Sequence, residues 1–186
     1  MLTSLVLLVG MLLGGVKVDD VPPDYIGKDI HGNEVRLSQY RGRVVVIDFW
    51  ASWCSPCREE LAVLDGIQRQ VSPQRLVVLA VNWREGSNRF RQIVEVLGEN
   101  TKLTLLDDAK GSISAPYNIH GIPFVVVIGK DGRIADIRRG FSKSLTPQFV
   151  DELNKLLAVD TAPARAVATP SSARPAPVHP PSPGAG

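Results

Sequence analysis

The chain contains 186 residues, of which 44% are hydrophobic and 22% are charged. This composition fits one globular domain with an apolar core. The net charge of +2 is too small to favour nucleic acid or an anionic membrane surface as the main partner. Only two cysteines are present, so the chain carries no framework of structural disulfides.

The first 20 residues are predicted to form a hydrophobic leader. Residues 2–16 contain no charged side chain and are mostly Leu, Val, Met and Gly. A spanning helix needs about 20 apolar residues, so the shorter run is closer to the apolar part of an export signal. No Lys or Arg precedes it and no Ala-x-Ala site follows it. A signal peptide, a short anchor and a buried core segment remain alternatives, and the first two predict an extracytoplasmic protein, periplasmic or membrane-anchored.

Residues 21–158 are predicted to form the folded domain, which begins with a short hairpin around residues 33–37. Residues 44–50 form a continuous apolar run, which is typical of a strand buried on both faces. A helix is expected from Cys54 to about Gln70, and residues 76–82 predict the next buried strand.

The second half of the domain continues this alternation. Apolar residues on one side predict a helix around 90–97, and residues 124–128 predict a third strand. The Asp131-Gly132 turn should return the chain antiparallel over 133–139. Thr146 and Pro147 can begin a last helix that runs to about Leu157. The pattern predicts an α/β fold with a mixed central sheet, helices on both faces and an N-terminal hairpin extension.

The last segment, residues 159–186, is predicted to be a disordered tail rich in Ala, Pro and Ser. It contains no Leu, Ile, Phe, Tyr or Trp. Such a segment cannot bury enough apolar surface to offset the entropy lost on ordering.

The two cysteines form a Cys54-Ser55-Pro56-Cys57 motif where a buried strand runs into a helix. Unpaired N–H groups and the dipole at a helix N-terminus favour the thiolate, which is the form that attacks a disulfide. Cys57 lies one turn further along and can resolve the mixed disulfide formed by Cys54. The motif therefore predicts thiol–disulfide exchange, although paired cysteines also bind metals.

The residues around the cysteines carry a more specific signal. Residues 49–60, FWASWCSPCREE, resemble the active-site signature of the TlpA/ResA-like thioredoxins, within the redoxin (AhpC/TSA-like) group of the thioredoxin superfamily. Residues 32–42, 81–85 and 117–123 resemble further segments of that family. The resemblance implies a thioredoxin-like fold and an exported thiol–disulfide oxidoreductase, most simply a reductase. It also implies a cis peptide bond before Pro123, with Pro123 and the backbone of Ile122 facing the substrate. Trp53 is expected to shape the rim of the site.

Two acidic residues are further candidates for catalysis. Asp48 lies in the buried run before the cysteines, where burial would raise its pKa toward the range of a general base. It matches the buried Asp of thioredoxin, which is proposed to move the proton of the resolving cysteine, although TlpA/ResA-like proteins usually have Asn there. Glu60 matches an active-site Glu of ResA-like proteins, and its alternative is a solvated acid in the first helical turn.

The resemblance also implies partners. Substrates would be disulfide-bearing proteins, such as those of cytochrome or copper assembly, and a membrane thiol–disulfide donor would supply electrons; no cofactor or bound metal is expected. A copper chaperone with Cys54, Cys57 and His120 as ligands is an alternative function, because two thiolates suit Cu(I). A thiol peroxidase is a weaker alternative, because the Pro-x-x-x-Thr-x-x-Cys motif of peroxiredoxins is missing from both cysteine positions.

Overall fold

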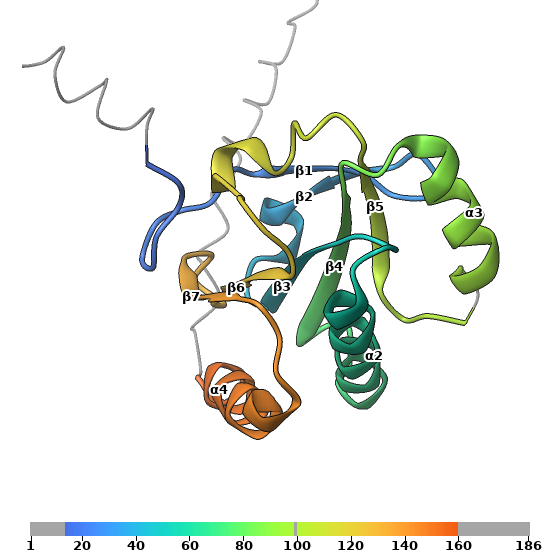
Figure 1. The fold of residues 1–186 in the computed structure, drawn as a ribbon. Coiled ribbons are helices and arrows are strands. Elements are labelled where there is room, and N and C mark those ends of the chain that lie inside the picture. Colours follow the sequence, from blue (N-terminus) through green and yellow to red (C-terminus); the bar gives the residue numbers. More distant parts are fainter. Residues whose placement is uncertain (1–13, 99, 160–186) are drawn as a thin grey trace, which may run out of the picture.

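The computed structural model describes residues 14–98 and 100–159, and the described chain forms a five-stranded sheet with helices packed on it (Figure 1). The strand order is β5-β4-β3-β6-β7. Strands β3, β4 and β5 are parallel, whereas β6 is antiparallel to β3 and β7 is antiparallel to β6. The strands are β3 Val44–Trp50, β4 Leu76–Trp83, β5 Thr104–Asp108, β6 Phe124–Ile128 and β7 Ile134–Arg139.

The central strand β3 is buried along its whole length. Both of its faces are covered, which explains why its sequence is apolar without alternation. Its neighbours fix its register, since Asp48 pairs with Ala80 of β4 and with Val125 of β6. β3 ends at Trp50, and the cysteines follow directly after this carboxyl end of the strand.

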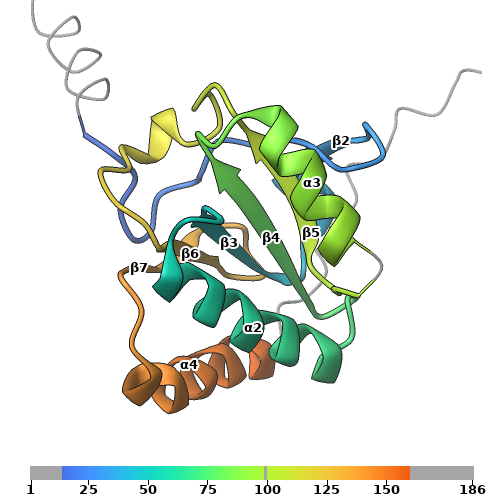
Figure 2. The ribbon, with the colours of Figure 1, turned by 45° about the vertical axis from the view of Figure 1, so that its right-hand side comes forward.

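Three α-helices cover one face of the sheet, as Figure 2 shows: α2 Ser55–Gln70, α3 Ser87–Leu97 and α4 Thr146–Ala158. Leu64 of α2 and Phe149 of α4 share one apolar cluster with Val44 and Val46 of β3. Phe90 of α3 belongs to a second cluster on the same face, which also contains both cysteines. The cysteines are therefore part of the packed core beneath this helical layer.

The other face is covered by the N-terminal hairpin and by 3-10 helices. The hairpin strands are β1 Tyr25–Lys28 and β2 Glu34–Arg36, and the 3-10 helices η1 Leu37–Tyr40 and η2 Ala115–Tyr117 pack beside them. A third 3-10 helix, η3 Lys143–Leu145, precedes α4. Gly27 has a φ of 110°, and a Cβ there would lie 2.6 Å from the Ile113 side chain. Only glycine fits this close approach without strain.

The fold class predicted from the sequence is confirmed, with its mixed sheet and N-terminal hairpin. Of the helices expected on both faces, the α-helices lie on one face and 3-10 helices lie on the other. Strand β5 was not predicted; it extends the parallel side of the sheet beyond β4. Residues 17–20, assigned to the leader, lie against the domain, because Asp19 N–H donates to Ile134 O and Ile134 N–H donates to Asp20 O, both at 2.9 Å.

The predictions for residues 1–13 and 160–186 fall outside the described residues. Within 14–98 and 100–159, no helix combines the length and the apolar character that a membrane span requires.

Candidate active site

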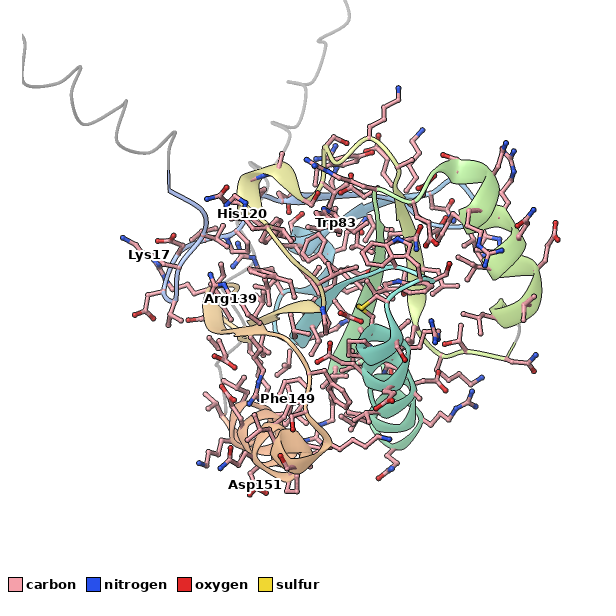
Figure 3. The ribbon with its side chains drawn as sticks, viewed as in Figure 1. Lys17, Trp83, His120, Arg139, Phe149 and Asp151 are labelled. Atoms are coloured by element: carbon pink, nitrogen blue, oxygen red, sulfur yellow. A yellow bond between two sulfur atoms is a disulfide. The ribbon has the colours of Figure 1, made fainter. Side chains whose placement is uncertain are left out.

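Cys54 and Cys57 are joined by a disulfide at the start of α2, with their Cα atoms 5.3 Å apart (Figure 3). Cys54 is the N-cap residue of the helix, and the Cys57 N–H donates to its sulfur at 3.3 Å. Pro56 occupies the first turn, where a missing N–H costs no helical hydrogen bond. The exposed fraction is 5% for Cys54 and 0% for Cys57. An incoming thiol or disulfide can therefore reach Cys54, whereas Cys57 is enclosed.

The loop before β6 also reaches the cysteines. The peptide bond between Ile122 and Pro123 is cis, and Pro123 is buried. The Ile122 side chain packs against the cluster that contains Cys54 and Cys57. Trp53 lies beside Cys54 in the chain and is 65% exposed. The structure thus brings Ile122 to the cysteines, while the substrate-binding roles of these three residues stay predictions.

Two buried carboxyl groups lie near each other, those of Asp48 in β3 and Glu60 in α2. Asp48 is fully buried, and neither of its carboxyl oxygens has a hydrogen-bond partner in the described part of the chain. Burial, reinforced by the nearby Glu60 charge, raises the pKa of Asp48 well above its usual value. Burial also raises the pKa of Glu60 to about 7, although the charge of Arg138 opposes this.

Glu60 follows Cys57 by three residues, so both side chains lie on the buried face of α2. Glu60 is 6% exposed, and its Oε2 atom has no partner among the described residues. The alternative expectation of a solvated Glu60 is therefore wrong, because the helix turns this carboxyl group into the protein. Glu60 lies near enough to Asp48 for its charge to raise the pKa of that carboxyl group.

The sequence did not identify a polar network that holds the loop before Cys54. The Glu85 carboxylate accepts a hydrogen bond from Ser52 N–H at 2.7 Å, a second from the Ser52 hydroxyl, and one from Asn82 Nδ2 at 2.8 Å. Arg58 donates to Ser52 O at 2.7 Å, and Arg89 donates to Ser52 Oγ at 3.3 Å. Side chains from α2, from α3 and from the loop between β4 and α3 thus hold Ser52, two positions before Cys54.

Glu85 is ionised within this network. Burial acts to raise its pKa, but the hydrogen bonds from Ser52 and Asn82 outweigh burial and hold the pKa below its usual value. The signal that could have revealed the network is an acidic residue directly after a buried strand, at the same edge of the sheet as the cysteines. We assign Glu85 to positioning of the active-site loop.

The copper ligands of the alternative function, a copper chaperone, are not assembled among the described residues. Within residues 14–98 and 100–159, no three His, Cys, Asp or Glu side chains lie together in a way that could hold a metal ion. His120 is exposed, on the loop before the cis peptide bond. The described part of the chain therefore offers no site in which His120 joins both cysteines.

Comparison with known proteins agrees with this geometry. The AhpC/TSA family matches residues 18–137. The chain belongs to the AhpC/TSA family. It is 32% identical over 128 residues to the thioredoxin-like protein YneN of Bacillus subtilis, covering 68% of this chain and 74% of YneN. It is 30% identical over 125 residues to the thiol–disulfide oxidoreductase ResA of Geobacillus kaustophilus, covering 67% of this chain and 71% of ResA.

A solved structure extends the likeness within the AhpC/TSA family to the fold. A Chlorobium tepidum protein assigned as the thiol:disulfide interchange protein DsbE matches with a TM-score of 0.69 and 26% identity, covering 77% of this chain and 99% of that protein. The resemblance to ResA-like thioredoxins is thus confirmed, as is the predicted enzyme class, a thiol–disulfide oxidoreductase. Disulfide-bearing proteins are the general class of substrate that this activity implies.

Proposed function

We propose that this protein is an extracytoplasmic reductase of protein disulfides that works through a Cys54/Cys57 cycle. The observation that carries the proposal is the unequal burial of the two cysteines at the start of α2. Cys54 has the helix N-terminus to stabilise its thiolate and is the sulfur that a substrate can reach. Cys57 is enclosed and adjacent, which suits a resolving thiol.

The reaction proceeds in two exchange steps. The reduced Cys54 thiolate attacks one sulfur of a substrate disulfide, forms a mixed disulfide and releases the other substrate sulfur as a thiolate. Cys57 then gives up its proton and attacks the Cys54 sulfur, which releases the second substrate thiolate and closes the Cys54–Cys57 disulfide. The substrate gains two electrons, and the protein loses two. The structure described above corresponds to this oxidised state.

Asp48 and Glu60 are proposed to take up the proton of Cys57. A buried carboxylate with a raised pKa is a stronger base than a solvated one, and proton transfer near its pKa is efficient. The burial of Asp48 and its electrostatic contact with Glu60 support this role. Ile122, Pro123 and Trp53 are proposed to hold the substrate chain beside Cys54.

The direction of electron flow and the cellular location belong to the same proposal. Ser55 and Pro56 lie between the cysteines, without the His that strong oxidants place there to stabilise the thiolate. The uncharged residues 2–16 support export from the cytoplasm. Outside the cytoplasm a membrane thiol–disulfide donor would have to reduce the protein again, and proteins of cytochrome or copper assembly would be candidate substrates.

The reduction potential of the Cys54–Cys57 pair tests the proposal. The oxidised protein is equilibrated with dithiothreitol or glutathione buffers, and the fraction of free thiol is measured after acid quenching. A value near that of thioredoxin, about −270 mV, is expected for a reductase. A value near about −120 mV, as for strong oxidants, would contradict the proposed direction. Cys57→Ser should accumulate the mixed disulfide, and failure to do so would contradict the role of Cys57.

A further inference from the structure

A groove lies beside the cis peptide bond between Ile122 and Pro123. It has a volume of about 520 Å³, and Ile122, Pro123 and Arg139 are among its lining residues. The Ile122 side chain also packs against the cluster that contains both cysteines. Ile122 therefore connects the groove to the cysteine cluster, although neither cysteine lines the groove itself.

The backbone along this groove is open to a peptide. Neither the N–H nor the C=O of Ile122 takes part in a backbone hydrogen bond within the part of the chain that the structure describes. At the next residue, Pro123 O accepts a hydrogen bond from Gly140 N–H at 2.9 Å, which closes the end of the β6–β7 pair. Backbone polar groups without partners favour an extended chain that pairs with them.

The guanidinium of Arg139 gives the groove a positive charge. Arg139 and His120 both line it, on the same side of the molecule (Figure 3), and its lining contains no Asp or Glu. The Arg139 guanidinium lies 5.1 Å from the centre of the Phe124 ring and has no hydrogen bond or ion pair to any described residue. Its neighbour Arg138, in contrast, lies 3.7 Å from Asp136 and 3.5 Å from Glu152.

Two acidic residues close to the active-site loop, Glu59 and Glu85, already have partners. Glu59 pairs with Lys143 at 3.2 Å, and Glu85 is held by Ser52 and Asn82. Arg139 is thus a guanidinium whose charge no neighbouring carboxylate neutralises, exposed beside the peptide-binding backbone. A carboxylate of a bound chain could accept its hydrogen bonds, and the His120 ring can add a further N–H donor.

We propose that this groove, lined by Ile122, Pro123, His120 and Arg139, selects protein substrates that carry an acidic residue next to the reacting cysteine. The inference rests on the proposed function, and it adds the substrate class. Cys54 would attack the sulfur of the bound cysteine while Arg139 holds the adjacent carboxylate. Arg139 then acts as a specificity-determining residue that touches the substrate.

The test compares two short peptides that differ only in the residues flanking one cysteine, Glu-Cys-Glu and Gln-Cys-Gln. The cysteine of each carries 5-thio-2-nitrobenzoate in a mixed disulfide. Reduced protein attacks the peptide sulfur and expels the coloured thiolate, whose release gives the second-order rate constant. Each rate is divided by the rate of the same peptide with dithiothreitol, which removes the intrinsic difference between the peptides.

We expect the normalised rate to be about two- to fivefold higher for the Glu peptide, as for an exposed ion pair. Arg139→Gln should abolish this preference, and 0.5 M NaCl should reduce it. Arg91→Gln is the control, because it removes the same charge from exposed α3, away from β7 (Figure 1). Equal rates for both peptides, or an equal loss of preference in both variants, would overturn the inference. If neither peptide reacts, the proposed function itself fails.

Discussion

Replacement of Glu60 by Gln should change how the stability of the protein depends on pH. In the unfolded chain this carboxyl group ionises near 4.5, whereas burial under α2 raises its pKa to about 7 in the folded protein. Between these pH values the folded state binds more protons than the unfolded state, so the free energy of unfolding falls as pH rises. The contribution is fully present below pH 4.5 and is lost by about pH 7.

The size of this loss follows from the two pKa values. The difference between 4.5 and about 7 corresponds to about 3 kcal/mol, at about 1.4 kcal/mol for each pKa unit. Glu60→Gln keeps the shape of the side chain and removes the ionisation. We therefore expect the variant to lose less stability than the wild type from pH 5 to pH 8, by about 2–3 kcal/mol.

Urea unfolding of the oxidised protein, followed by tryptophan fluorescence, measures this difference, because urea does not screen charges and the disulfide keeps the cysteines from titrating. Glu59→Gln is the matched control. The Glu59 side chain is 48% exposed and pairs with Lys143 on the surface. This control should keep the wild-type dependence on pH. If Glu60→Gln and wild type lose the same free energy between pH 5 and pH 8, Glu60 does not retain its proton in the folded protein, and the reasoning is wrong.

Two further substitutions test the site. Asp48→Asn should slow resolution by Cys57 by about 100-fold at pH 7 while slowing the first attack far less, as measured by acid trapping of the mixed disulfide; equal slowing of both steps would remove its role as a base. Glu85→Gln should lower the free energy of unfolding by about 1–2 kcal/mol, because Ser52 loses a charged acceptor. The control Glu95→Gln, on the exposed face of α3, should change this free energy by only a few tenths of a kcal/mol. Equal losses in the two variants would contradict the role of the network.

The continuous apolar runs made the central strands predictable from sequence. Strands β3, β4 and β6 are buried on both faces, so apart from Asp48 and Asn82 their residues are apolar and mark the strands clearly. Strand β5 was missed because it lies at the edge of the sheet and ends in Asp107 and Asp108. Asp108 turns its carboxylate to the backbone N–H groups of Ile113 and Ser114, at 2.9 and 3.0 Å. From the sequence alone, such an acidic pair indicates a loop and not the end of a strand.

The same limit applies to the active site. Cys54 and Cys57 could be identified because their chemistry depends on spacing along one helix. Glu85 acts through contacts with Ser52, which lies 33 residues earlier, and no local pattern records such a pairing. The free guanidinium of Arg139 was hidden for a related reason. Only the folded chain distinguishes it from Arg138, which is next to it in the sequence and paired with acids on α4 and β7.

The two buried acids under α2 are best understood as one unit. Glu60 raises the pKa of Asp48 by its charge, so the pair resists holding two negative charges. At neutral pH such a pair tends to retain a proton while one carboxylate remains free to accept another. The charge of Arg138 opposes the rise in the pKa of Glu60, which stays at about 7. A proton leaving Cys57 would therefore meet a carboxylate that can accept it. Substitution of either acid should then alter the titration of the other, which measurement of the Glu60 pKa by carbon-13 NMR in Asp48→Asn would reveal as a lower value.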